Sequence, residues 1–382
     1  MSVRRFLPVP VLLLFAAGAA AAEGPRTARF SLAGASLAAG PDAAEGASWR
    51  FSPSLDPGHS FSALGAHWRG APEARLELSV SPDGASWSGW IAVPAEATIA
   101  PLREDGSPNP FGGEALGALV FVDPASRYVR FRTAAREGEA AGIPAEVTVE
   151  VIDPGEVPRD EAAAHAAAPF RRARVPEAEL PGPGPLAPRP GIHSRASWGA
   201  RPPKQGYAYT LAGHVGIHHT ASVADFEAAT WEACAARIRA IQTYHMDTNG
   251  WNDIGYAYVV CRHGDVFQAR EDDDDATDVH GAHDGFNRGS TSVSALGYFH
   301  APYDQRPTPE QLGAIVSLAS WIAARRGIDP LGRSLYEAFG GPADNFYGHR
   351  DVSATACPGD RLYVELGAIR TAAAERALSQ PF

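Results

Sequence analysis

A proline- and alanine-rich stretch, residues 154–190, most constrains how this chain can fold. Much of it reads AAAHAAAPFRRARVPEAELPGPGPLAPRP, without a regular spacing of apolar residues. Repeated proline favours extended backbone, and a segment without an apolar face has nothing to bury, so this composition predicts a semi-rigid linker. The 382 residues are enough for two domains. We therefore expect one folded domain on each side of the linker.

Residues 24–153 have the pattern of an all-β domain. RLELSV (75–80), YVRFR (128–132) and EVTVEV (146–151) alternate apolar and polar residues, as a strand with one buried face does. The turn-forming segments SPDGAS and FVDPAS lie between such stretches. Short strands with frequent turns predict a jelly-roll-like β-sandwich, and no motif in it identifies a ligand.

After the linker the pattern becomes one of alternating strands and helices. HVGIHHT (214–220) alternates like a strand, whereas residues 231–245 repeat apolar side chains at three- and four-residue steps, like an amphipathic helix. WNDIGYAYVV (251–260) and SVSALGYF (292–299) have the composition of further strands. This order predicts an α/β domain, residues 191–382, with a mixed central sheet flanked by helices.

A second helix is predicted in TPEQLGAIVSLASWIAARRGI, which has signals at both ends. Thr308 is the expected N-cap, Pro309 occupies the first turn, and Gln311 is the expected capping-box partner. Gly327 is the expected stop signal.

Residues 1–22 are typical of a secretory signal peptide. Arg4 and Arg5 precede an apolar run that ends at Phe15, and alanines up to Ala22 form a small-residue cleavage site. A buried N-terminal helix is the alternative. The apolar run is too short for a membrane-spanning helix, and no later segment is apolar enough. We therefore expect a protein that works outside the cytoplasm, secreted or periplasmic.

The charge balance bears on possible partners. The formal net charge of −11 and the isoelectric point of about 5.6 argue against a nucleic-acid-binding protein, which normally has a basic surface. A local basic patch stays compatible with these values.

The chain contains three cysteines, Cys234, Cys261 and Cys357. In an oxidising compartment this odd number leaves one thiol without a disulfide partner, whatever the pairing. Cys357 lies in GHRDVSATACPG (348–359), eight positions after His349.

These residue types suggest a metal site. Thiolate and imidazole are zinc ligands, and catalytic zinc sites typically have three protein ligands with the fourth position open to water. His218, at the end of a predicted strand, is the best candidate for a third ligand beside His349 and Cys357. From the residues alone two alternatives stay open: His349 as a capping or core histidine, and Cys357 as a buried thiol.

Five segments of the chain together resemble the zinc amidase family, which contains N-acetylmuramoyl-L-alanine amidases of bacteria and phages and the animal peptidoglycan recognition proteins. The resemblance covers about residues 190–370, and five separated motifs in family order are far more specific than any one of them. The segments are SRASWGA (194–200), GIHHT (216–220), YHMDTNGWNDIGYAYVV (244–260), GAHDGFN (281–287) and GHRDVSATACPG (348–359).

The resemblance implies a site with one zinc ion. His218, His349 and Cys357 match the zinc ligands of the family. Tyr256 matches the catalytic tyrosine, and Thr355 occupies a position where relatives have lysine or threonine as a second polar catalytic group. His219 alternates away from His218, so we interpret it as structural or as a support for the ligands.

The implied activity is hydrolysis of the amide between N-acetylmuramic acid and L-alanine in peptidoglycan. The presence of Cys357 favours an enzyme, because noncatalytic relatives usually lack that cysteine; a noncatalytic recognition protein is the alternative. An unrelated zinc peptidase is disfavoured, since the chain has no HExxH motif. The expected partners are peptidoglycan or muropeptides, with no nucleic acid. We expect a monomer, and association with the cell wall stays open.

The resemblance also implies less specific contacts. Trp251, Arg270, His283 and Asn287 fall in or beside motifs that line the substrate groove. EDDDD (271–275) departs from the family pattern in a segment where relatives recognise the stem peptide, so the stem-peptide preference stays open. Because some secreted relatives bridge the same two elements, we expect a disulfide between two cysteines, Cys234 and Cys261.

Overall fold

The computed structural model describes residues 24–39, 49–99, 107–134, 143–156, 187–270, 277–278 and 285–378. The predicted signal peptide and most of the predicted linker lie outside these ranges, so both stay predictions. Within the described ranges, no helix is long and apolar enough to cross a membrane.

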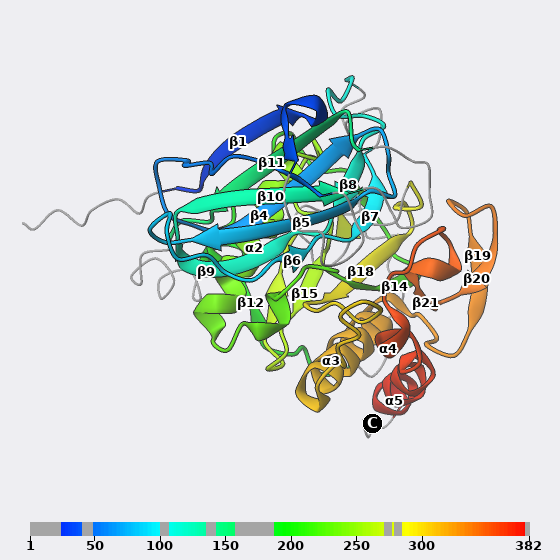
Figure 1. Ribbon diagram of the computed structural model, residues 1–382. Coiled ribbons are helices and arrows are strands. Elements are labelled where there is room, and N and C mark those ends of the chain that lie inside the picture. The colour runs from blue at the N-terminus through cyan, green and yellow to red at the C-terminus, as the bar shows by residue number, and fades with distance from the viewer. Residues whose placement is uncertain are drawn as a thin grey trace, which may run out of the picture.

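The N-terminal part of the chain forms two antiparallel β-sheets, seen in the upper half of Figure 1. The 6-stranded sheet has the order β1 (Arg26–Ala33), β11 (Glu146–Asp153), β4 (Phe61–Arg69), β8 (Ala115–Gly117) and β7 (Ala95–Thr98), and β9 (Val120–Ser126) pairs with β4. The 5-stranded sheet has the order β2 (Ala38–Ala39), β3 (Arg50–Phe51), β10 (Tyr128–Ala134), β5 (Arg75–Ser81) and β6 (Ile91–Ala92).

Both sheets contribute to one apolar core. Leu64 and Val149 of the first sheet pack with Leu78 and Phe131 of the second, and all four are fully buried. The predicted all-β character of this region is confirmed, and its jelly-roll connectivity stays a prediction. FVDPAS is not a turn, because β9 runs through it as a strand.

The opposite face of the 5-stranded sheet has a ladder of stacked arginine and tryptophan side chains. Arg130 and Arg132 alternate with the core residues of β10, so both point away from the core. The Arg130 guanidinium lies 4.2 Å from the ring centre of Trp87, and that of Arg132 lies 4.1 Å from the ring centre of Trp49. Trp90 contacts both arginines. These cation–π contacts stabilise the outer face of the 5-stranded sheet. The alternating sequence of β10 predicts only that this face is polar.

The C-terminal part is built on a 6-stranded mixed sheet, as predicted. Its pairs are parallel except for the antiparallel β15/β16 pair. The order is β12 (Ile192–His193), β16 (Val266–Gln268), β15 (Tyr258–Val260), β18 (Ser290–Ala295), β14 (His214–His219) and β21 (Phe346–Gly348). Two small sheets flank it, β13 (Tyr209–Thr210) with β17 (Thr277–Asp278) and β19 (Arg333–Tyr336) with β20 (Gly341–Asp344).

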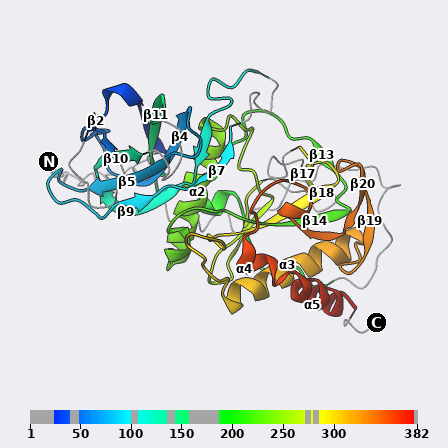
Figure 2. The same cartoon turned by 45° about the vertical axis from the view of Figure 1, so that its right-hand side comes forward.

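Helices cover both faces of this sheet. Helices α3 (Pro309–Arg326) and α5 (Leu366–Leu378) lie side by side against one face (Figures 1 and 2), where Val215 and Ile217 of β14 join their core. Helix α2 (Trp231–Asp247) covers the other face, and the short helix α4 (Asp360–Tyr363) precedes α5. Because side chains alternate along a strand, His218 points to the side opposite Ile217.

The predicted ends of α3 are confirmed, with one correction. The Thr308 hydroxyl accepts a hydrogen bond from the Gln311 amide, and Gly327 ends the helix in the left-handed conformation at φ 65°. The Gln311 side chain is not a capping-box partner. Its amide group donates to the carbonyls of Val260 and Leu296 at 3.0 Å, so it attaches the helix to the sheet.

The predicted strand 251–260 is also shorter than expected. Regular strand structure begins only at Tyr258. The preceding backbone turns at Gly255, where an added Cβ would overlap the ring of Trp251. The loop therefore packs its own tryptophan closely, and Tyr256 precedes the regular strand, although its carbonyl accepts from the Arg270 amide at 2.9 Å.

The two parts of the chain pack against each other. Ala63, Phe121 and Ile152 of the first sheet belong to the same apolar cluster as α2. Backbone hydrogen bonds join Val223 to Phe121 and to Leu119, with N···O distances of 2.9 and 2.7 Å. Strand β11 is therefore buried on both faces, although its alternating sequence predicts one exposed face.

A disulfide joins Cys234 of α2 to Cys261, which follows β15. It links the helix to the central sheet across a sequence separation of 27 residues. This is the pairing that the resemblance implies, and it leaves Cys357 outside any disulfide.

The double variant Cys234→Ala/Cys261→Ala should have a free energy of unfolding about 2–4 kcal/mol lower than the wild type. Without the cross-link, the unfolded chain regains the conformational entropy that the closed loop removes. Chemical denaturation measures this change. A phosphine reductant should destabilise the wild type by a similar amount and leave the double variant unaffected. Equal stability of the variant and the oxidised wild type would contradict the prediction.

Gly65→Ala should destabilise the contact between the two parts by about 1–3 kcal/mol. An added Cβ at Gly65 would overlap the buried ring of Tyr244 on α2, so strand and helix would have to separate. Gly89→Ala is the matched control, because Gly89 is exposed and a Cβ there meets no atom within 4 Å. Urea unfolding of the full chain should show a loss only for Gly65→Ala.

Candidate metal centre and active site

Three buried side chains come together at one edge of the mixed sheet. The Nδ1 atom of His218 lies 3.5 Å from the Sγ atom of Cys357. The ring centres of His218 and His349 are 4.5 Å apart. One ligand atom from each of the three residues lies within 4.8 Å of the others.

Strand pairing explains why these residues meet. Strands β14 and β21 are parallel neighbours, and their last pair joins Ile217 to Gly348. The residue that follows each of these two in the chain is a histidine, so His218 and His349 lie side by side where the pairing ends. The chain then turns back, and the Arg350 amide donates to the Cys357 carbonyl at 2.9 Å. This turn places the cysteine beside the two imidazoles.

The three side chains fit a divalent metal such as zinc. In a tetrahedral site with Zn–N near 2.0 Å and Zn–S near 2.3 Å, neighbouring ligand atoms are about 3.3–3.8 Å apart. The distance between His218 and Cys357 agrees with this range. The His219 amide lies 3.4 Å from Cys357 Sγ, as a donor that stabilises a thiolate. Within the described ranges, no other cluster of His, Cys, Asp and Glu has this geometry.

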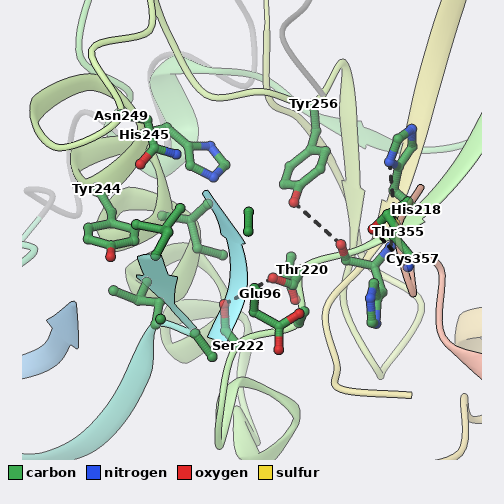
Figure 3. Close-up of a pocket in the computed structure, with 18 of the residues that line it drawn as sticks. Glu96, His218, Thr220, Ser222, Tyr244, His245, Asn249, Tyr256, Thr355 and Cys357 are labelled. Atoms are coloured by element: carbon green, nitrogen blue, oxygen red, sulfur yellow. Dashed lines mark hydrogen bonds between the residues drawn. The ribbon is translucent and has the colours of Figure 1, made fainter. Parts of the chain in front are cut away.

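Two hydroxyl groups face the same space (Figure 3). The Tyr256 hydroxyl donates to the His219 carbonyl over 3.3 Å, and its ring centre lies 6.0 Å from that of His218. Thr355 accepts a hydrogen bond from the Cys357 amide at 3.2 Å, so it holds the cysteine loop and still has a hydroxyl proton to donate.

These groups line a cavity of about 460 Å³. Helix α2 contributes the wall that includes Tyr244 and His245. The N-terminal sheet contributes another wall, formed by Glu96, Ala97, Ile99, Leu116, Gly117, Ala118 and Leu119. The cavity therefore lies between the two parts of the chain.

Comparison with known proteins shows the family of this chain. A family model described as N-acetylmuramoyl-L-alanine amidase matches residues 212–360. Peptidoglycan-recognition protein SC2 of Drosophila simulans is 34% identical over 178 residues, which are 46% of this chain and 84% of that protein. This chain belongs to the N-acetylmuramoyl-L-alanine amidase and peptidoglycan recognition protein family.

Other family members match over the same share of the chain. The human protein named N-acetylmuramoyl-L-alanine amidase is 33% identical over 178 residues, but these are only 27% of its length. The solved structure of Drosophila peptidoglycan recognition protein SD has 26% identity, covers 46% of this chain and 91% of its own, and has a TM-score of 0.38.

The other substrate-contact residues that the family motifs suggest lie in different surroundings. Trp251 lines the cavity and packs against His245 at a tilt of 46°, with ring centres 4.5 Å apart. Arg270 is fully buried, with its guanidinium 5.8 Å from the ring centre of Tyr207, and it does not line the cavity. Asn287 accepts a hydrogen bond from Ser290 in the turn before β18. Contact of Arg270 and Asn287 with substrate stays a prediction.

Two predicted features fall outside the described residues. One is His283, the residue expected to contact the glycan or the peptide. The other is the acidic segment 271–275. Their roles stay predictions.

His219 is placed in a supporting position. Its ring is buried, and its Nδ1 atom accepts from the Phe299 amide at 3.4 Å. Burial lowers the pKa of His219 well below its ordinary value, so the ring is neutral. Together with the amide that it directs at Cys357, this environment agrees with the supporting role interpreted from strand alternation.

Sequence reasoning missed His245 and Glu96 as cavity residues. Burial lowers the pKa of His245 to about 3, and its Nδ1 atom accepts from the Gly255 amide at 3.1 Å. Helical periodicity places His245 on a buried face, but that signal equally describes a core residue. No pattern in the sequence connects Glu96 with the cavity, because its strand belongs to the other part of the chain.

Proposed function

We propose that this protein is a zinc-dependent N-acetylmuramoyl-L-alanine amidase that cleaves the amide between N-acetylmuramic acid and L-alanine in peptidoglycan. The main support is the convergence of His218, His349 and Cys357 in the lining of a cavity that Tyr256 also lines. The proposed partners are peptidoglycan or muropeptides, outside the cytoplasm, and we expect the protein to act as a monomer.

The proposed ligands have the donor types that zinc requires. His218 and His349 would bind as neutral imidazoles and Cys357 as a thiolate, helped by the His219 amide. Bound zinc lowers the pKa of its water to about 7 and polarises a carbonyl group, which an unactivated amide needs.

Tyr256 and Thr355 would act on the substrate itself. The Tyr256 hydroxyl can transfer its long hydrogen bond from the His219 carbonyl to the negative charge that develops on the substrate carbonyl oxygen. Thr355, fixed by the Cys357 amide, can donate its proton to the same oxygen or orient the attacking water. A threonine has no positive charge, so stabilisation of this oxygen depends mainly on the metal and Tyr256.

A noncatalytic recognition protein is the alternative function. The family contains peptidoglycan recognition proteins as well as amidases, and both use peptidoglycan as ligand. The presence of Cys357 together with both histidines and Tyr256 favours the enzyme. Mass spectrometry of digested muropeptides separates the possibilities: an amidase releases intact stem peptides from intact sugars, a recognition protein releases nothing, and a peptidase leaves trimmed stems on the glycan.

His349→Ala and Cys357→Ser should each reduce bound zinc to below about a tenth of the wild-type content, because two ligands bind zinc far more weakly than three. Elemental mass spectrometry after dialysis measures the metal. His263→Ala is the control, since His263 is exposed and lies outside the cavity. Full zinc content in both ligand variants would exclude this site.

Tyr256→Phe should reduce the rate of stem-peptide release by about 10²–10³-fold, the usual loss for one donor to a developing oxyanion. Zinc content and folding should stay at wild-type values, because the ring and its packing are retained. Tyr209→Phe, at an exposed position outside the cavity, should have wild-type activity. Full activity of Tyr256→Phe with zinc bound would show that Tyr256 is not the oxyanion donor.

A further inference from the structure

We propose that the N-terminal β-domain forms part of the substrate site, and that Glu96 is a substrate-binding residue that accepts a hydrogen bond from an N–H or O–H group of the peptidoglycan fragment. This inference rests on the proposed function, because it concerns the same cavity. It gives the all-β domain a role in recognition at the reaction centre.

The position of Glu96 is the first support. Strand β7, which contains Glu96, pairs with β8 at the edge of the 6-stranded sheet, and both strands line the cavity that the metal ligands also line. Figure 3 shows Glu96 beside Thr220 and Ser222, with the Tyr256 hydroxyl on the far side of the same space. A substrate that fills this cavity from the proposed metal site would therefore contact the wall that contains Glu96.

The wall is held firmly against the α/β domain. The buried Tyr298 hydroxyl donates to one carboxylate oxygen of Glu96. The backbone of Val223 hydrogen-bonds to Leu119, another residue of the wall. These contacts place Glu96 in a fixed position, as a binding residue requires.

The carboxyl group has unused capacity to accept hydrogen bonds. Among the described residues, Tyr298 is its one hydrogen-bond partner, whereas a carboxylate can accept several hydrogen bonds. Burial raises the pKa of Glu96 to about 7, against the opposing effect of the Tyr298 hydroxyl. A poorly solvated carboxyl group beside a cavity is stabilised when a ligand donates to it.

The surrounding wall defines the chemistry of the ligand. Ile99, Leu116 and Leu119 make this side of the cavity apolar, so Glu96 is its one ionisable group among the described lining residues. A matching ligand has an apolar surface and one hydrogen-bond donor directed at Glu96. A muramyl peptide offers such donors in two places, the hydroxyl groups of the sugar and the amide N–H groups of the stem.

The test measures binding and kinetics of the full-length, zinc-loaded protein with muramyl tripeptide. Glu96→Leu removes the acceptor and should raise both KM and the dissociation constant about tenfold, with kcat within about threefold of wild type. Glu96→Gln keeps one oxygen acceptor and should raise them by a smaller factor, about threefold. Calorimetry in a Tyr256→Phe background measures the dissociation constant while turnover is about 10²–10³-fold slower.

Tyr303→Phe is the matched control. It removes a hydrogen bond between the same two domains but does not line the cavity. Its dissociation constant should equal that of the parent protein, and thermal unfolding should verify that all variants fold. If Glu96→Leu does not fold, the nearly isosteric Glu96→Gln supplies the result. A dissociation constant unchanged in the folded Glu96 variants would overturn the proposal.

Two further measurements identify the ligand group that donates to Glu96 and separate the Glu96 proposal from the amidase proposal. A weaker affinity of Glu96→Leu for the sugar-free tripeptide places the donor on the stem, and a weaker affinity for N-acetylmuramic acid places it on the sugar. If the wild type hydrolyses the substrate and the Glu96 variants have an unchanged KM, this inference is overturned and the amidase proposal stands. If binding depends on Glu96 but the wild type does not hydrolyse the substrate, the amidase proposal is overturned and the role of Glu96 in binding stands.

Discussion

The parallel pairing of β14 with β21 is the constraint on which the rest of the site depends. The pairing ends at Ile217 and Gly348, and the residue that follows each of them is a histidine, so the two histidines lie side by side. Alternation directs Ile217 into the core of α3 and α5 and His218 to the opposite side. The Thr355 hydroxyl accepts from the Cys357 amide, and the Arg350 amide donates to the Cys357 carbonyl. These two hydrogen bonds hold the loop so that the Cys357 thiol lies beside the imidazoles.

A second constraint is the burial of the N-terminal sheet against α2. Strands β4 and β11 are covered on both faces, by the sandwich core on one side and by the helix on the other. Gly65 permits the close approach, since the Tyr244 ring occupies the space of its missing side chain. As a result the edge of the β-domain, with Glu96, forms part of the cavity that contains the proposed metal ligands.

Local sequence signals predicted the elements that have a clear periodicity or clear end signals of their own. Alternation located β5, β10 and β11, and Thr308 and Gly327 marked the ends of α3. Predictions were wrong where tertiary contacts decide the conformation. FVDPAS has turn composition but pairs with β4 in part as β9, and the Gln311 side chain bonds to the sheet and not to its own helix end. Packing of Trp251 against Gly255 shortens the strand expected at 251–260.

The sequence by itself determined the two-part organisation, the α/β character of the second part and the residues of the candidate metal site. Composition, periodicity and motif order are properties of single segments, so they can be read one segment at a time. Only the tertiary structure decided that the β-domain packs onto α2 and brings Glu96 to the cavity. The physical reason is that this interface buries apolar side chains from strands and a helix far apart in the chain, and its complementarity exists only after both parts have folded.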